Sequence, residues 1–169
     1  MPQFQTERLT IRPFARDLML TAIADSTKAG ARLGLRVAEG WPNAAERDAL
    51  PFLADELARQ PGLAEWGMQI LIHTEEAIII GTAGFKGKPL DNGTVELGYG
   101  IAPAYQGRGY ATEAVRGLIA WAFTQSQVKR VFANCLPENA ASARVLTKAG
   151  FQPLPPTVGY LNWELRRGW

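Results

Sequence analysis

Residues 95–114 read VELGYGIAPAYQGRGYATEA, and this stretch decides the fold. Apolar and small or polar residues alternate in its first part, which predicts a strand from Thr94 to Ile101. Pro103 stops that strand, and a helix is expected to begin near Arg108. Apolar residues then recur at helical spacing as far as Ala122, so this helix should lay one face on a sheet.

The turn between this strand and this helix has the composition of an anion-binding loop. Gly107 and Gly109 can adopt positive φ and let a ligand approach the backbone closely. Consecutive N–H groups at the positive end of a helix suit a pyrophosphate, and Arg108 can add charge. A dinucleotide fingerprint needs a third glycine where Thr112 stands, and no Gly-Lys-Ser/Thr is present for a Walker loop. A helix start that uses glycine only for a tight turn is the alternative explanation.

Further strands and helices are predicted on both sides of this stretch. The expected strands are Arg8 to Pro13, Met68 to His73, Ala77 to Ile80, Val131 to Leu136 and Tyr160 to Leu165. Three further helices are expected: a short one that begins at Asp17, one from Ala44 to Arg59 and one from Asn139 to Ala149. Two segments are expected to be irregular, a loop or weak helix at Gly30 to Asn43 and a loop at Pro153 to Pro156. This order of elements predicts an α/β domain with a mixed sheet.

Length and composition limit the classes of protein to consider. The 169 residues fit one domain, expected to span residues 1–169. The net charge is +2 and the basic residues are scattered, which disfavours nucleic acid and membrane surfaces as partners. Cys135 and His73 are the only cysteine and histidine, so no metal is expected. Without a signal-peptide pattern or an apolar run of about 20 residues, a cytoplasmic location is expected.

Two separated motifs resemble those of a known family. The segment VELGYGIAPAYQGRGYATEAV, followed by NAASARVLTKAGF, is similar to the GNAT superfamily of N-acetyltransferases. The acetyl-CoA loop of that family reads Gln/Arg-x-x-Gly-x-Gly/Ala, which Gln106, Gly109 and Ala111 match. The opening TERLTIRPF resembles the branch of the ribosomal-protein alanine acetyltransferases, the RimJ/RimL type. The resemblance implies a GNAT fold, with a mixed, mostly antiparallel sheet of six to seven strands, splayed in the middle, and about four helices.

The resemblance also implies acetyl-CoA as cosubstrate, without a metal. In the family, main-chain N–H groups of the loop hold the pyrophosphate, and the preceding strand pairs with the pantetheine arm where a neighbouring strand splays away. Asn139 can also cap the helix that follows it. Arg144 and Lys148 are interpreted as solvated helix charges. The residues placed at the cofactor are Ile101, Ala102, Gln106, Gly107, Arg108, Gly109, Tyr110, Ala111, Thr112, Asn134, Asn139 and Ser142.

Acetyl transfer to an amine requires a base, because the amine is protonated at neutral pH. Glu96 is the candidate base, since strand alternation places it on one face with Gly98 and Gly100 and leaves room for a substrate. An exposed or salt-bridged strand residue is the alternative reading of Glu96. Glu138 is the second choice of base.

The leaving thiolate needs a proton or a hydrogen bond. Many family members carry a tyrosine for this in the helix before a Gly-Phe pair, but this chain has Val145 and Leu146 there. Ser142, Tyr99 and Tyr110 are the candidates in its place. A backbone N–H near Ile101 or Ala102 is the candidate that holds the oxyanion.

The function implied is transfer of an acetyl group from acetyl-CoA to an amine, by direct attack in a ternary complex. The acceptor is a peptide N-terminus or a small-molecule amine, and a homodimer is a further expectation from the family. A non-catalytic acyl-CoA-binding sensor module and a binding protein for another phosphate ligand are the alternatives. Five aromatic residues line the acceptor pocket or simply pack in the core: Trp41, Trp66, Phe85, Tyr160 and Trp163.

Overall fold

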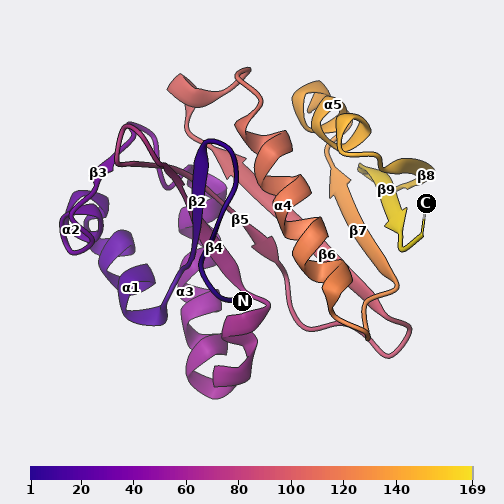
Figure 1. The fold of residues 1–169 in the computed structure, drawn as a ribbon, viewed down its shortest axis with the longest axis horizontal. Helices are drawn as coiled ribbons and strands as arrows, with labels where there is room; N and C mark the ends of the chain where they lie inside the picture. Colours follow the sequence, from indigo (N-terminus) through magenta and orange to yellow (C-terminus); the bar gives the residue numbers. More distant parts are fainter. Residues whose placement is uncertain (169) are drawn as a thin grey trace.

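Helices and strands alternate along residues 1–168, the part of the chain that the computed structural model describes (Figure 1). The strands are β1 (Phe4–Gln5), β2 (Leu9–Pro13), β3 (Arg36–Val37), β4 (Met68–His73), β5 (Ile78–Phe85), β6 (Thr94–Ile101), β7 (Arg130–Cys135), β8 (Gln152–Thr157) and β9 (Tyr160–Arg166). The α-helices are α1 (Arg16–Ala24), α2 (Ser26–Ala31), α3 (Ala44–Arg59), α4 (Tyr110–Thr124) and α5 (Ala140–Lys148). Short 3₁₀-helices lie at η1 (Pro61–Glu65) and η2 (Pro103–Tyr105).

The strands form one sheet in the order β1-β2-β4-β5-β6-β7-β9-β8, with β3 paired to β5. The pairs β3–β5 and β6–β7 are parallel, and the other neighbours are antiparallel. The predicted mixed, mostly antiparallel sheet is therefore confirmed. Within the described residues it has nine strands rather than six or seven, and five α-helices rather than four, because short elements such as β1, β3 and α2 also form.

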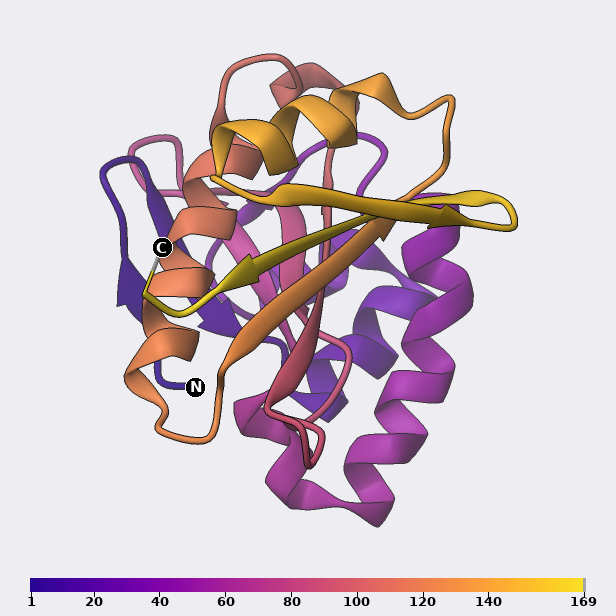
Figure 2. The same ribbon diagram turned by 90° about the vertical axis from the view of Figure 1, so that its right-hand side faces the viewer.

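The helices lie on both faces of the sheet (Figure 2). Helix α4 crosses one face, where it contacts β2, β5 and β6. Helices α1 and α3 pack against each other on the opposite side. Helix α5 contacts both α4 and β7, and Arg116 in the first half of α4 donates a hydrogen bond to the carbonyl of Lys148 in α5. The second half of the sheet is therefore enclosed by α4 and α5.

The core forms where α4 meets the middle of the sheet. The apolar stripe predicted for α4 is buried, and Leu118 at its centre has no exposed surface. Strand β5 is buried along its whole length. Its run of isoleucines, apolar on both faces, had predicted a central strand. Trp121 of α4 contacts Trp66 and Phe85, with ring centroids 4.8 Å and 6.1 Å away. These contacts fix α4, and with it the turn before α4, to the sheet.

Two segments differ from the sequence prediction. Pro153 to Pro156, expected to be a loop, belongs to β8. Proline lacks an N–H, but β8 lies at the end of the sheet and pairs only with β9, where a missing donor is tolerated. The segment Gly30 to Asn43 contains the end of α2 and the two-residue strand β3, so it is more ordered than expected.

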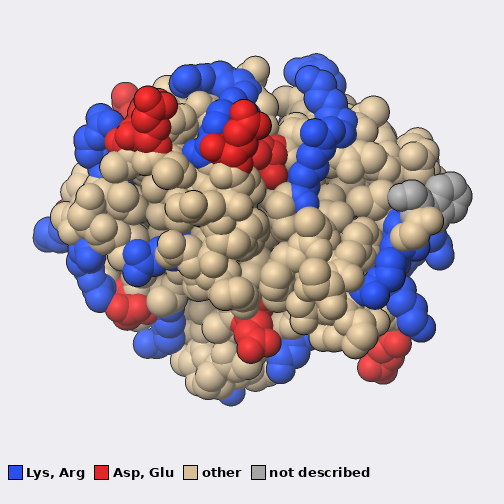
Figure 3. Space-filling model, in the orientation of Figure 1, with Lys and Arg blue, Asp and Glu red and all other residues tan. Residues whose placement is uncertain are grey.

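The surface carries charges of both signs. Figure 3 shows them dispersed around the edge of one face, without a continuous basic band. Among residues 1–168, no helix is long and apolar enough to cross a membrane. In the same part of the chain, no three His, Cys, Asp or Glu side chains gather where a metal ion could be held.

The packing of α4 can be tested by truncating its central side chain. Leu118→Ala is expected to lower the free energy of unfolding by about 2–5 kcal/mol, because it leaves a cavity in the core. Leu90→Ala, at a side chain that is 64% exposed, serves as the control and should change stability by less than about 0.5 kcal/mol. Urea denaturation of both variants makes the measurement. Equal effects would contradict the placement of α4.

Candidate functional site

Strands β6 and β7 are paired at one end only. Their parallel pairing covers Thr94–Glu96 and Arg130–Phe132, although β6 continues to Ile101 and β7 to Cys135. Beyond that point β6 keeps β5 as its partner, in unbroken register to Ile101. The sheet is therefore open between the far ends of β6 and β7, and one edge of β6 offers unpaired backbone groups.

A cavity of about 380 Å³ lies at this opening, bounded by β6, the turn before α4, and α5. Ten of the residues that the sequence analysis placed at the site line this cavity. They are Tyr99, Ile101, Gln106, Gly107, Gly109, Tyr110, Ala111, Thr112, Asn139 and Ser142. Two segments distant in sequence, residues 99–112 and 139–142, are thus brought to one place.

The turn before α4 presents unused backbone donors to the cavity. Gly107 and Gly109 have φ of 73° and 87°, a conformation in which a residue with a Cβ is strained. Gly109 is the N-cap of α4 and gives that end no side-chain cap. Within the described chain, no hydrogen bond has the N–H of any of residues 107–112 as its donor. Free donors at the positive end of a helix suit an anion.

The start of α5 forms the facing wall. The Asn139 side chain accepts the N–H of Ser142 at 3.0 Å, so it is the N-cap, which was one of the two roles considered for it. Arg144 and Lys148 are exposed, as expected, but they also line the cavity, which the sequence analysis did not predict. They add positive charge on the α5 side, where a phosphorylated ligand would benefit from it.

Two backbone N–H groups were considered for holding the oxyanion, those of Ile101 and Ala102, and only one of them is available. Ala102 is buried, lies outside the cavity lining and donates its N–H to the carbonyl of Ile80 at 2.8 Å. Its expected role is therefore wrong, because this donor is already used inside the sheet. Alternate residues of a strand direct their backbone groups to opposite sides, so the N–H of Ile101 points to the open edge.

Glu96 lies outside this cavity. Its carboxylate pairs with the Lys86 ammonium at 2.5 Å and accepts a hydrogen bond from Asn134 at 3.3 Å. It lines a second hollow, of about 320 Å³, together with Lys86 and Arg130. The salt-bridged alternative considered for Glu96 describes this geometry. Asn134, expected at the cofactor, instead contacts Glu96 and does not line the first cavity.

Two other predicted residues also lie away from the cavity lining. Arg108 is exposed and holds its guanidinium 5.4 Å from the ring centres of both Tyr105 and Tyr110. Both rings line the cavity, but Arg108 itself does not, so its contact with the cofactor stays a prediction. Glu138, the second choice of base, is exposed and lines neither hollow.

Tyr99 and Ser142 meet inside the cavity. The Tyr99 hydroxyl lies 2.7 Å from the Ser142 hydroxyl and donates to the Ser142 carbonyl at 3.2 Å. Burial raises the pKa of Tyr99 to about 12, although the hydrogen bond with Ser142 acts in the opposite direction. Tyr99 therefore keeps its proton at neutral pH and can serve as a hydrogen-bond donor. Two of the three predicted catalytic residues are thus side by side.

Glu46 is a half-buried carboxylate that the sequence analysis missed. It lies in the first turn of α3, where it accepts the Asn43 N–H at 2.7 Å and the Thr82 hydroxyl. A Cβ at Gly100 would come within 2.9 Å of its Oε1, so the carboxylate rests directly on β6. Gly100 and Asn43 both line the cavity. The sequence signal was present, because Asn43-x-x-Glu46 is a capping-box pattern, but that pattern does not show which way the carboxylate faces.

The burial of Glu46 affects its ionisation. Desolvation raises the pKa of Glu46, against the lowering effect of the hydrogen bonds from Thr82 and Asn43. A carboxylate with a raised pKa is a stronger base than an exposed one.

Three of the aromatic residues considered for an acceptor pocket are core residues: Trp41, Trp66 and Phe85 are 3%, 4% and 1% exposed.

An open strand edge beside a turn of free N–H groups has the geometry that an extended, phosphorylated ligand would require. The chain matches the acetyltransferase (GNAT) domain over residues 8–152 and belongs to that family of acyltransferases. The N-acetyltransferase YjdG of Bacillus subtilis, named as uncharacterized, is 29% identical over 163 residues, which cover 96% of this chain and 97% of that protein.

Solved structures share the fold. The ribosomal-protein-S5-alanine acetyltransferase of Vibrio fischeri superposes with a TM-score of 0.67 at 22% identity, over 99% of this chain and 98% of that one. RimL, a ribosomal L7/L12 alpha-N-protein acetyltransferase solved in complex with coenzyme A, gives a TM-score of 0.70 at 16% identity, over 98% of both chains. The predicted GNAT fold with its splayed sheet is confirmed.

The buried position of Glu46 predicts a pH-dependent effect of Glu46→Gln on stability. The folded pKa is raised, so the contribution of Glu46 is fully present below its unfolded pKa and is lost as pH rises through the folded value. The stability of the variant relative to wild type should therefore improve between pH 4 and pH 7. Urea denaturation at both pH values measures the difference. A difference that stays constant, or falls with pH, contradicts a raised pKa.

Proposed function

We propose that the protein transfers the acetyl group of acetyl-CoA to an amine by direct attack in a ternary complex. One observation carries the proposal: a single cavity joins a turn of free N–H groups to an unpaired strand edge. The turn at residues 107–112 suits the pyrophosphate of CoA. The edge of β6 suits the amide groups of the pantetheine arm, which can add to it as a strand does. ATP and NAD carry no extended amide chain that would use this edge.

Tyr99 and Ser142 are the proposed partners of the leaving group. When the amine attacks the thioester carbon and the C–S bond breaks, the sulfur departs as a thiolate and needs a proton. The Tyr99 hydroxyl is protonated and lies in the cavity, so it can donate a hydrogen bond to the thiolate, which then takes its proton from solvent, while Ser142 orients the hydroxyl. The N–H of Ile101, on the open edge, is the proposed donor to the oxyanion.

Two carboxylates are candidates for taking the proton of the attacking amine. Glu46 lies against Gly100, which lines the cavity, although Glu46 itself is not one of the lining residues, and it is not paired with a cation in the described structure. Glu96 lies beyond the cavity lining and is neutralised by Lys86. Lys86 therefore already occupies the Glu96 carboxylate, which leaves it less accessible to an amine. We therefore place Glu46 before Glu96 in this role.

The acceptor we propose is a primary amine, either a peptide N-terminus or a small molecule. The names of the structural neighbours, which include ribosomal-protein acetyltransferases, support an N-terminal acceptor and a RimJ/RimL-like branch. A non-catalytic acyl-CoA sensor is the second candidate, and the position of Glu96 outside the cavity favours it. The Tyr99–Ser142 pair and the naming of relatives as N-acetyltransferases favour the enzyme.

Ligand-induced thermal stabilisation tests the cofactor. Acetyl-CoA and CoA should stabilise the wild type by about 2.7 kcal/mol at a hundred times their dissociation constant. Gly109→Glu should abolish the effect, because a residue with a Cβ is strained at a φ of 87° and its Cβ would come within 3.4 Å of Arg8 Nη2, so the turn would lose the conformation that presents its free N–H groups. Gly159→Glu is the matched control, because Gly159 also has a positive φ, 81°. It lies in the turn between β8 and β9, where a Cβ would have no other atom within 4 Å. Stabilisation by ATP or NAD instead of acetyl-CoA would refute the proposed cosubstrate.

The choice of base is tested by comparing two variants. Thiol release from acetyl-CoA is measured with peptides that begin with alanine or serine and with a polyamine panel as acceptors. Glu46→Gln should lower kcat by about 10²–10⁴-fold, the usual contribution of a general base, with unchanged affinity for CoA. Gln at this position still completes the capping box, so α3 keeps its start. A larger loss in Glu96→Gln than in Glu46→Gln would assign the role to Glu96.

A further inference from the structure

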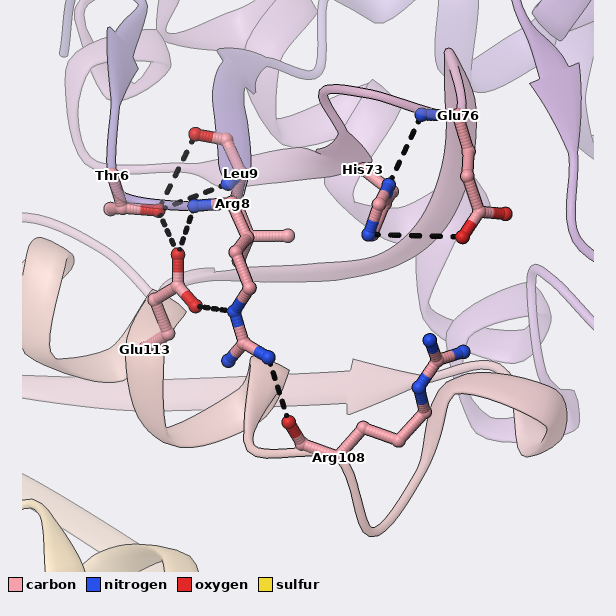
Figure 4. Close-up of polar contacts among 7 residues, drawn as sticks. All are labelled: Thr6, Arg8, Leu9, His73, Glu76, Arg108 and Glu113. Atoms are coloured by element: carbon pink, nitrogen blue, oxygen red, sulfur yellow. Dashed lines mark hydrogen bonds and ion pairs between the residues drawn. The ribbon is translucent and has the colours of Figure 1, made fainter.

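The residues before and at the start of β2 hold the turn from its outer side (Figure 4). Glu113, one turn into α4, receives three hydrogen bonds there. Its Oε1 accepts the Thr6 hydroxyl at 2.6 Å and the Arg8 N–H at 2.7 Å, and its Oε2 accepts the Arg8 Nε–H at 2.7 Å. Its side chain is only 14% exposed. The amino-terminal segment is therefore fastened to the first turn of α4.

The same arginine reaches the turn itself. Arg8 Nη1 donates to the carbonyl of Arg108 at 3.0 Å, and the guanidinium lies 4.4 Å from the ring centre of Tyr110. A Cβ at Gly109 would come within 3.4 Å of Arg8 Nη2. Arg8 thus contacts three consecutive residues of the turn, while its Nε–H is tied to Glu113.

Neither Arg8 nor Glu113 lines the cavity. Any effect of theirs on a ligand must therefore act through the turn. The turn contains two glycines with positive φ, and none of its N–H groups donates a hydrogen bond inside the described chain. No hydrogen bond from its own amides therefore holds it in one conformation. The contacts from Arg8 supply that restraint from outside.

We propose that Arg8 and Glu113 are positioning residues that hold residues 107–112 in the phosphate-binding conformation before CoA arrives. The inference rests on the proposed use of CoA. A loop that is already ordered loses less conformational entropy on binding, so the ligand binds more tightly. The opening segment of the chain thereby determines affinity for a ligand that it does not touch.

If Glu113 acted only through its charge, Glu113→Gln would change the affinity for CoA in the opposite direction. Hydrogen bonds from Thr6 and Arg8 hold the pKa of Glu113 below its ordinary value, against the effect of its burial, so it is ionised at neutral pH. A negative charge behind an anion site weakens anion binding. On charge alone, Glu113→Gln should therefore bind CoA more tightly. As a positioning residue, Glu113 should give weaker binding when it is replaced, because Oε2 no longer holds Arg8.

The test measures CoA binding by isothermal titration calorimetry in the full chain. Glu113→Gln should weaken binding on the order of tenfold, the effect of losing one hydrogen bond between charged groups. Arg8→Lys keeps the charge but loses the fork that joins Glu113 to Arg108, and it should weaken binding similarly. The double variant should be no weaker than either single one, because both break the same restraint.

Glu164→Gln is the matched control. It disrupts the Arg130–Glu164 ion pair, whose side chains are 30% and 14% exposed against 39% and 14% for Arg8–Glu113, and which joins β7 to β9 away from the turn. Its CoA affinity should stay within about twofold of wild type. In the free protein, nuclear magnetic resonance order parameters of residues 107–112 should be lower in Glu113→Gln than in the control.

The outcomes separate this inference from the proposed function. Wild-type or tighter CoA binding by Glu113→Gln overturns the positioning role and leaves CoA binding intact. A loss in Glu164→Gln equal to that in Glu113→Gln also overturns it, since general destabilisation then explains both. If the wild type does not bind CoA, the proposed function and this inference fall together.

Discussion

The site depends on the point at which β6 and β7 stop pairing. Three residues of each strand are joined, and beyond Glu96 and Phe132 the backbone of β6 has a partner on one side only. An unpaired strand edge inside a protein is costly unless something covers it. Here α4 and α5 enclose it without filling it, which leaves room for an extended ligand. The cavity, the free N–H of Ile101 and the Tyr99–Ser142 pair all follow from this opening.

The two sides of β6 have separate roles. Tyr99 and Ile101 face α4 and α5, where the cofactor is proposed to lie, while Glu96 and Gly100 face the side of α3. Gly100 leaves the space in which the Glu46 carboxylate rests on the strand. Gly100 has no side chain to separate the two sides of β6. The Glu46 carboxylate on one face and the proposed thioester at the open edge can therefore act on one reacting centre. Helix α3 and the cavity thereby belong to one arrangement.

The sequence was most informative where local chemistry determines structure. The glycine turn, the stripe of α4 and the Asn139 cap follow from residues within a few positions of each other, and the structure has them as predicted. Prediction failed where the partner is distant in sequence. Glu46 meets Gly100, and Arg8 meets Glu113, only because separate elements pack together. Alternation grouped Glu96 with Gly98 and Gly100, but it could not reveal that Lys86, the residue just after β5, forms an ion pair with the Glu96 carboxylate.

The most direct test of this account is amide hydrogen exchange at residues 107–112 and at Ile101, with and without saturating CoA. These N–H groups are free in the described chain or point to the open edge of β6. If the turn holds the pyrophosphate and β6 pairs with the pantetheine arm, CoA should slow exchange at both places together. Binding of CoA that protects neither place, or that protects only the second hollow around Lys86 and Glu96, would contradict the account.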